Sequence, residues 1–124
     1  MARGPITSYR DLEVWQISMD LAVACYQITK SYPKSELFGL TSQIRRSANS
    51  IAANIAEGHG RESTASFIQF CRISQGSLKE LETHLVLSNR VQLLKADQVK
   101  ELIADCESVG RMLRAMIRSL QARQ

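Results

Sequence analysis

Two histidines are the first residues whose chemistry would matter, and neither lies in a spacing typical of a catalytic or metal site. His84 follows Glu80 by four residues, so both side chains share one helix face, where a simple surface contact is favoured. A carboxylate-bridged di-iron bundle requires two Glu-x-x-His motifs and two further glutamates, and the sequence has no Glu-x-x-His. His59 lies between two glycines but lacks the lysine and the strand of a phosphate loop, so it is predicted to lie in a turn.

Three cysteines, Cys25, Cys71 and Cys106, are widely spaced and lie among apolar positions of helical periodicity. Without a Cys-x-x-Cys pair, this pattern is typical of buried free thiols in a reducing compartment, and a metal site shared by all three is the less favoured alternative. The sequence also has no Gly-x-Ser-x-Gly elbow, no Walker loop and no dinucleotide-binding fingerprint. We therefore expect no catalytic residue, no metal ligand and no cofactor, and the chain is predicted not to be an enzyme.

A polar stripe is the most unusual feature of the sequence. Its members step by three or four residues, which places them along one side of a helix; they are Gln43, Arg46, Ser50, Asn54 and Glu57. Such a stripe is too polar for an ordinary core, and hydrogen bonding between helices or between subunits explains it well. Because arginine can bind carboxylates and phosphates through two parallel hydrogen bonds, direct contact with nucleic acid is the alternative.

Four segments of helical hydrophobic periodicity must position these residues, at about 10–31, 36–57, 63–88 and 96–120. Pro33 ends the first segment because it disfavours helical geometry in the residue before it. Gly58 and Gly60 are expected to end the second, since glycine readily adopts the left-handed conformation at a helix C-terminus. Four helices of about 30 Å joined by short connections pack antiparallel. The chain is therefore predicted to be one all-α domain, residues 1–124, folded as an up-and-down antiparallel four-helix bundle.

Small side chains in the second segment and a glycine in the third predict close helix packing. Ser47, Ala48, Ala52 and Ala56 would let neighbouring helices approach the second segment from more than one side. Gly76 lies in the interior of the third segment, where glycine costs roughly 1 kcal/mol relative to alanine. Close approach of another backbone at Gly76 would be one reason to keep a glycine there.

The charge balance is mildly basic, with 16 Lys and Arg against 12 Asp and Glu, a net charge of +4 and a pI near 9.2. Such a surface suits nucleic acid or an acidic protein, although ordinary solubility explains it equally well. In the fourth segment acidic residues precede arginines, an order that matches the helix dipole and would also form a phosphate patch. No segment is long and apolar enough to span a membrane and no signal peptide is present, so a cytoplasmic protein is expected.

Five motifs resemble one known family, the four-helix-bundle proteins encoded in intervening sequences of 23S ribosomal RNA genes. The motifs are YRDLEVW at 9–15, YPKSE at 32–36, FGLTSQIRR at 38–46, SIAANIAEG at 50–58 and GSLKELET at 76–83. The resemblance covers about residues 9–120 and implies an up-and-down bundle that assembles as a homopentameric ring. This family includes the accessory variability proteins of diversity-generating retroelements, which are similar in fold, bind a reverse transcriptase and have a basic surface suited to RNA or DNA.

The residues and the resemblance together predict a non-enzymatic homo-oligomeric scaffold that binds RNA, DNA or a ribonucleoprotein partner. A protein-only adaptor, for example for a reverse transcriptase or another polymerase, is the alternative. The expected nucleic-acid or partner contacts are Arg45, Arg46, Arg61, Arg72, Lys79 and Arg90. The expected oligomer interface, on the small-residue face of the second helix and one end of the first, consists of Trp15, Gln43, Ser47, Ser50, Asn54 and Glu57.

Overall fold

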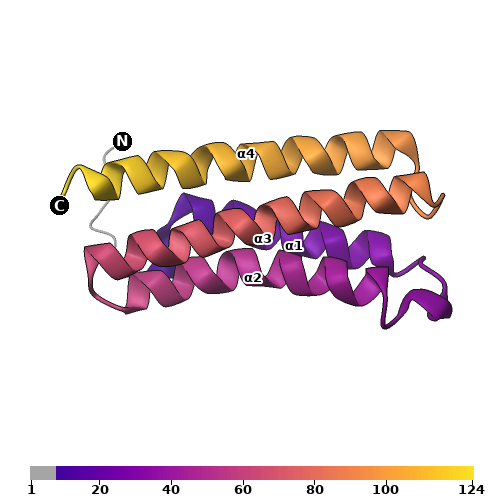
Figure 1. Ribbon diagram of the computed structural model, residues 1–124, viewed down its shortest axis with the longest axis horizontal. Helices are drawn as coiled ribbons and strands as arrows, with labels where there is room; N and C mark the ends of the chain where they lie inside the picture. The colour runs from indigo at the N-terminus through magenta and orange to yellow at the C-terminus, as the bar shows by residue number, and fades with distance from the viewer. Residues whose placement is uncertain (1–7) are drawn as a thin grey trace.

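The computed structural model describes residues 8–124, which form four long helices and no strand (Figure 1). The helices are α1 (Glu13–Thr29), α2 (Leu40–Gly60), α3 (Thr64–Arg90) and α4 (Ala96–Gln121), with short 3-10 turns η1 (Tyr9–Asp11) and η2 (Lys34–Glu36) before α1 and α2. Each long helix runs antiparallel to the one before it, and α2 packs most extensively on α3. The all-α four-helix fold predicted from the sequence is confirmed.

The apolar stripes of all four helices meet in one core. The predicted stripes supply most of its fully buried side chains, among them Ile44, Ile51, Ile55, Leu78, Leu81, Leu85, Val109 and Leu113. Removing a large apolar side chain of this kind from water contributes roughly 1.5–3 kcal/mol. The core therefore supplies the main force that holds the helices side by side.

Local backbone geometry moves the starts of α1 and α2 away from the predicted positions. α1 begins at Glu13 rather than near residue 10, because Leu12 is extended, with φ −74° and ψ 123°. α2 begins at Leu40 rather than near residue 36, because the predicted first turn is the separate turn η2. The carboxylate of Glu36 caps α2 by accepting a hydrogen bond of 3.1 Å from the backbone N–H of Leu40.

Two glycines have roles other than those predicted. α2 continues through Gly58 to Gly60 without a positive φ, and Glu62, with φ 60°, adopts the left-handed conformation in the turn instead. Gly58 matters because α3 lies against it: a Cβ at this position would be 2.7 Å from the Cβ of Phe70. Gly76 is exposed, and a Cβ there would have nothing within 4 Å, so the predicted close approach at Gly76 is wrong.

The second pair of helices follows the sequence prediction closely. Ser63 caps α3, its hydroxyl accepting a hydrogen bond of 3.3 Å from the N–H of Ser66. α3 and α2 are also joined in the core, where the buried hydroxyl of Ser74 donates to the carbonyl of Ile51 at 2.8 Å. α4 begins at the predicted Ala96 and ends one residue beyond the predicted position 120.

Candidate functional site

The six cationic side chains predicted to contact nucleic acid are spread along the bundle. They are Arg45 and Arg46 on α2, Arg61 in the following turn, and Arg72, Lys79 and Arg90 on α3. Because α2 and α3 are antiparallel, the start of α2 and the end of α3 lie at one end of the bundle, far from the turn that joins them (Figure 1). These six residues therefore do not form one patch.

Arg45 has partners within the chain. Its Nε donates a hydrogen bond of 2.9 Å to the hydroxyl of Thr29, and its guanidinium lies 4.6 Å from the ring centre of Tyr26. Asn49 donates to the hydroxyl of the same tyrosine at 2.9 Å. These contacts join α2 to the last turns of α1, so Arg45 contributes to helix packing.

Arg46 and Arg61 also have local partners. Arg46 donates to the side chain of Gln43 at 2.9 Å, one turn earlier on α2. Arg61 lies 3.6 Å from the carboxylate of Glu57 and stacks over the ring of Phe70 at 5.1 Å. The carboxylate of Glu57 therefore partly compensates the charge of Arg61, and the hydrogen bond to Gln43 holds the guanidinium of Arg46 against α2.

The fold instead brings cations from α3 and α4 together along one groove. Lys79, Arg111 and Arg114 line this groove, which has a volume of about 400 Å³. Gly110 makes room for it, since a Cβ at this position would be 3.3 Å from Cδ2 of Leu78 and 3.7 Å from Nη1 of Arg114. The guanidinium of Arg114 can therefore fold back over α4 toward α3.

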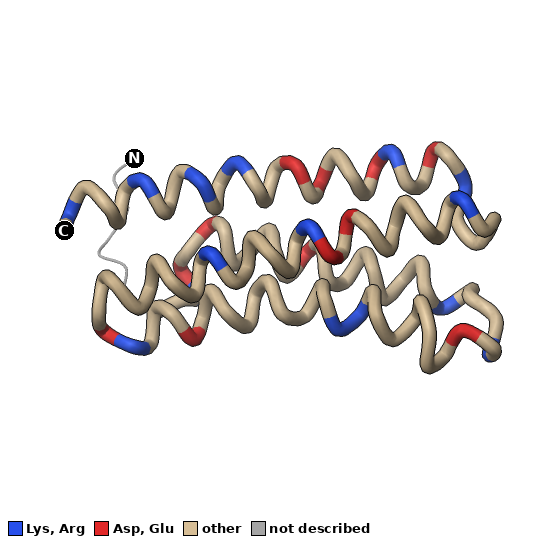
Figure 2. The backbone as a smooth tube through the Cα atoms, in the orientation of Figure 1, with Lys and Arg blue, Asp and Glu red and all other residues tan. Residues whose placement is uncertain are grey.

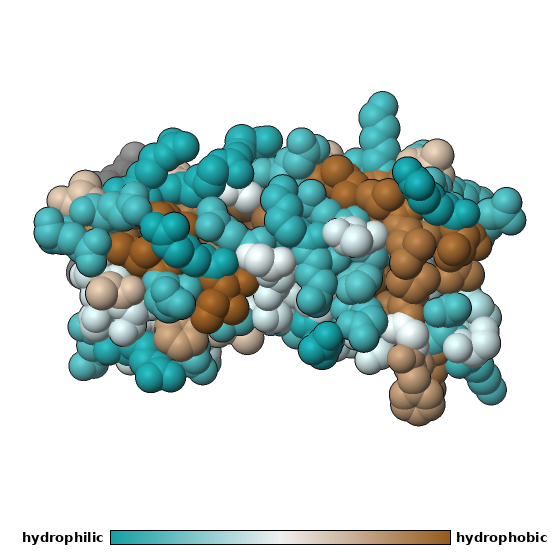
Figure 3. All heavy atoms as spheres, viewed as in Figure 1, coloured by the Kyte–Doolittle hydropathy of each residue, from teal (hydrophilic) through white to brown (hydrophobic). Residues whose placement is uncertain are grey.

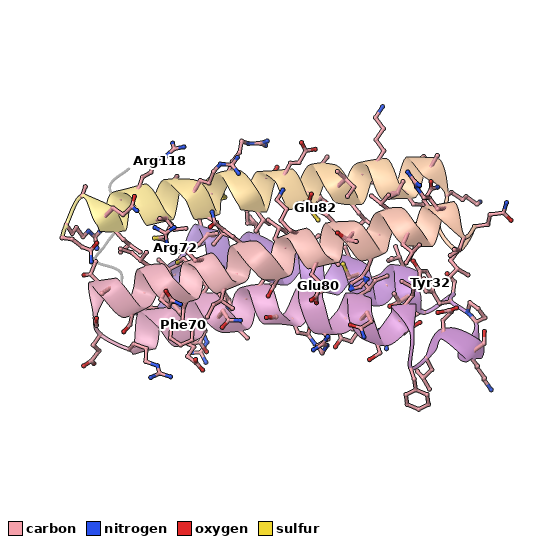
Figure 4. All side chains as sticks on the ribbon, in the orientation of Figure 1. Tyr32, Phe70, Arg72, Glu80, Glu82 and Arg118 are labelled. Atoms are coloured by element: carbon pink, nitrogen blue, oxygen red, sulfur yellow. The ribbon has the colours of Figure 1, made fainter. Side chains whose placement is uncertain are left out.

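Arg72 and Arg118 extend this set along the same two helices. Because residue 78 packs against residue 110 and the helices are antiparallel, residue 72 lies opposite about residue 116. Figure 4 labels both side chains in the half of the bundle that contains the C-terminus. Both arginines are exposed and have no ion-pair or hydrogen-bond partner among residues 8–124. We call this set the basic groove: Arg72, Lys79, Arg111, Arg114 and Arg118.

Charge along the basic groove is not uniform. Glu82 and Glu107 also line it, and Nζ of Lys79 lies 3.3 Å from a carboxylate oxygen of Glu82. Toward the C-terminus of α4 the charged residues are all basic, as the blue segments in Figure 2 show. Figure 3 shows hydrophilic side chains along α4 in this half of the bundle, with hydrophobic atoms exposed between α4 and α3. Positive potential therefore rises from Glu107 toward Arg118.

The polar stripe of α2 forms hydrogen bonds within the chain. The hydroxyls of Ser50 and Ser77 are 2.8 Å apart, and Asn54 donates to the carbonyl and the hydroxyl of Ser50 at 2.8 and 2.9 Å. The predicted interhelical hydrogen bonding is confirmed for this part of the stripe. Ser47 is only 1% exposed and donates to the carbonyl of Gln43, so it faces the interior of its own bundle and cannot contact a second copy as predicted.

A second groove, between α1 and α2, is apolar. It has a volume of about 470 Å³, and its lining includes Trp15, Met19, Val23, Tyr26, Ala52, Ala53 and Ala56. Val23 is 54% exposed and Met19 40%, an unusual exposure for apolar side chains on adjacent turns of one helix. Of the predicted interface residues, Trp15 lies in this groove; Met19 and Val23 were missed because they fall outside the core-facing stripe of α1. We call this surface the apolar groove.

The three thiols are free and buried, as the sequence predicts. Burial, with a smaller contribution from the Asp105 carboxylate, raises the pKa of Cys25 to about 12. Burial raises the pKa of Cys106 to about 12 and that of Cys71 to about 11. These thiols are protonated at neutral pH, which makes them poor nucleophiles and poor metal ligands.

The histidines differ from their predicted settings. His59 lies in the last helical turn of α2 rather than in the predicted turn between helices, and its ring is edge-on to Phe67 at 5.8 Å. Nε2 of His84 is buried and has no hydrogen-bond partner within residues 8–124, so the expected surface contact with Glu80 is absent there.

Among residues 8–124, no three His, Cys, Asp or Glu side chains are grouped closely enough to hold a metal ion. No helix among these residues is long and apolar enough to cross a membrane.

The sequence profile of the 23S rRNA-intervening sequence proteins matches residues 10–115. The chain belongs to this family. A similar solved structure is the crystal structure of a protein of unknown function from the S23 ribosomal protein family of Bacteroides thetaiotaomicron. It is 28% identical, with a TM-score of 0.79, and the alignment covers 85% of this chain and 95% of that one. No curated protein matches the chain.

Proposed function

We propose that this member of the 23S rRNA-intervening sequence protein family is a non-enzymatic, homo-oligomeric scaffold that binds nucleic acid along the basic groove. The observation that carries the proposal is the convergence of five cations from two helices, three of them around one concavity. Guanidinium groups bind phosphate oxygens in a bidentate manner, and a groove lets several of them contact consecutive phosphates.

The helix dipole does not explain this arrangement. Favourable interaction with the dipole is confined to the last turn of a helix. α4 ends at Gln121, so Arg118 lies in its last turn, whereas Arg114 and Arg111 lie two and three turns from the end. Exposed like charges on one helix face repel each other, and a polyanion along the groove would offset this repulsion by attracting all of them.

Self-association would amplify the effect of the basic groove. The resemblance to the family implies a homopentamer, and the apolar groove supplies a surface that a second copy would cover. Each added copy brings another basic groove, so the field of the assembly grows although each chain carries only +4. Free buried thiols suit a reducing compartment, and the proposal places the protein in the cytoplasm.

Fluorescence anisotropy with a labelled single-stranded RNA of about 20 nucleotides tests the nucleic-acid part of the proposal. Three phosphate contacts on single-stranded RNA give a slope of about −2 for log affinity against log salt, a roughly 20-fold loss between about 50 and 200 mM salt. The variant Arg111→Gln, Arg114→Gln, Arg118→Gln is expected to bind weakly and to lose most of this salt dependence. The same measurement on DNA distinguishes the two nucleic acids.

The matched control removes three positive charges elsewhere, through Arg90→Gln, Lys95→Gln and Lys100→Gln, which are exposed at the opposite end of α3 and α4. This control is expected to retain most of the affinity, because only the position of the lost charges differs. Equal weakening by both triple variants would show that net charge alone drives binding and would overturn the groove assignment. A lack of binding to RNA and DNA at low salt would overturn nucleic-acid binding altogether and favour the protein-only adaptor.

A further inference from the structure

A small pocket at one end of the bundle is separate from the basic groove. It lies between the end of α1, the loop that contains η2 and the first turns of α2, and its volume is about 280 Å³. Tyr32, on its wall, is labelled in Figure 4 at the opposite end of the bundle from Arg118. We call it the end pocket; its cationic and threonine side chains are Thr29, Lys30, Lys34, Thr41 and Arg45.

The charge of the end pocket is positive and uncompensated. Lys30, Lys34 and Arg45 supply three cations, and none of the acidic side chains in the described part of the chain lines the pocket. None of the three cations forms an ion pair within residues 8–124. Glu36, whose carboxylate is the nearest in the sequence, accepts instead from the N–H of Leu40 at 3.1 Å. The end pocket therefore favours an anionic ligand.

Arg45 is held in a defined orientation and still has donors to offer. Its Nε donates to the hydroxyl of Thr29 at 2.9 Å, and its guanidinium lies over the ring of Tyr26 at 4.6 Å. The Thr29 hydroxyl is itself fixed, because it donates to the carbonyl of Cys25 at 2.7 Å. The two terminal nitrogens of Arg45 have no hydrogen-bond partner among residues 8–124. A fixed guanidinium with both terminal nitrogens unpaired is suited to bidentate binding of phosphate and loses little entropy on binding.

A buried hydroxyl on the pocket wall is also without a partner. Thr41 lines the end pocket and is only 5% exposed, and its hydroxyl makes no hydrogen bond within residues 8–124. Buried polar groups are normally paired, since an unpaired one costs free energy. Thr41 is also the second residue of α2, and the first amides of a helix have no acceptor within it. An anion in the end pocket would pair with this hydroxyl and lie at the positive end of α2.

We propose that the end pocket binds a phosphate group. Phosphate on an ester carries about −1.5 to −2 charges at pH 7 and three acceptor oxygens. It therefore matches three cations and the unpaired donors of Arg45 and Thr41 better than a carboxylate, which has one charge and two oxygens. The volume of about 280 Å³ is below the range typical of pockets that enclose drug-sized ligands, so the pocket receives the phosphate and not the whole of a larger molecule. This site is additional to nucleic-acid binding along the basic groove.

Isothermal titration calorimetry with inorganic phosphate at low ionic strength tests the end pocket. Lys34→Gln and Thr41→Val remove a charge and a hydroxyl that have no partner among residues 8–124, so neither variant breaks a contact that holds the fold. Lys34→Gln should weaken phosphate binding about 10-fold, and Thr41→Val roughly 3- to 10-fold. Lys100→Gln is the matched control, because it removes one exposed charge from α4, outside the pocket, and it should bind phosphate as the parent chain does.

Uridine 5′-monophosphate and uridine identify the source of the phosphate. Tighter binding of the nucleotide than of inorganic phosphate would identify an ester as the ligand, and the reverse order would identify the free ion. Uridine, which has no phosphate, should not bind in either case, and binding of uridine as tight as that of its monophosphate would overturn the proposal.

The position of the lost groups decides whether the end pocket is the site. Equal weakening by Lys34→Gln and Lys100→Gln, or an unchanged affinity in Thr41→Val, would overturn the assignment to this pocket. No binding of inorganic phosphate up to millimolar concentration would overturn the site altogether. The triple arginine variant of the basic groove should still bind phosphate, so a failure of nucleic-acid binding does not affect this test.

Discussion

Replacing Gly58 by alanine tests how closely α2 and α3 approach. The added Cβ would lie 2.7 Å from Cβ of Phe70 and 3.1 Å from Cδ1 of Phe67. The optimal separation of carbon atoms is about 3.5–4.0 Å, so the shorter contact is too close by about 1 Å. The Phe70 atom is next to its backbone and cannot rotate away, so the two helices must move apart.

The expected change in stability follows from two opposing effects. Alanine is favoured over glycine inside a helix by about 1 kcal/mol, whereas overpacking a well-packed site costs about 1–3 kcal/mol and occasionally more. The 2.7 Å contact places the overpacking cost in the upper part of this range, about 2–3 kcal/mol, so we expect Gly58→Ala to lower the free energy of unfolding by about 1–2 kcal/mol. Gly76→Ala is the matched control, because its Cβ would meet nothing within 4 Å. This control should raise the free energy of unfolding by up to about 1 kcal/mol.

Thermal unfolding followed by circular dichroism measures both variants. At about 4 °C per kcal/mol for a domain of this size, their Tm values should differ by about 10 °C, with Gly76→Ala the higher. Protein concentration must be the same throughout, because self-association also shifts the Tm. A Gly58→Ala variant as stable as Gly76→Ala would refute the close approach of α2 and α3.

Three further predictions concern the core and the cap of α3. Ser74→Ala removes the buried hydrogen bond to the Ile51 carbonyl and should lower the free energy of unfolding in urea by about 1 kcal/mol. Ser63→Ala should cost about 1 kcal/mol in the same assay by removing the cap of α3, and Ser63→Gly only a few tenths. The native thiols should resist an aromatic disulfide reagent at pH 8 and react fully after unfolding, and rapid reaction of the folded protein would contradict this. Because burial raises the pKa values of Cys25 and Cys106 from 9.0 to about 12, their contribution to the free energy of unfolding is fully present below pH 9 and declines as the pH rises toward 12.

The sequence predicts the helices well because their apolar spacing reports burial directly. The cap at Ser63 and the start of α4 were also predictable, since both depend on local chemistry. Glycines were misjudged because a glycine serves equally as a turn residue and as a point of close packing. At Gly58 and Gly76 only the position of the neighbouring helix distinguishes these roles.

The candidate site was harder to predict than the fold. Arg72 and Lys79 were expected to bind a partner, but their alignment with Arg111 and Arg114 depends on the register of α3 against α4. Helical spacing within one segment carries no information about that register. The role of Arg45 was obscured for the same reason, since Thr29 and Tyr26 belong to another helix.

Photocrosslinking to RNA that contains 4-thiouridine tests the central claim most directly, because it locates contacts without a variant. Mass spectrometry of the crosslinked peptides should place the adducts within residues 72–79 of α3 and 111–118 of α4, the two sides of the basic groove. Adducts confined to α1 and α2, or no adducts at low salt, would contradict the claim that this groove binds nucleic acid.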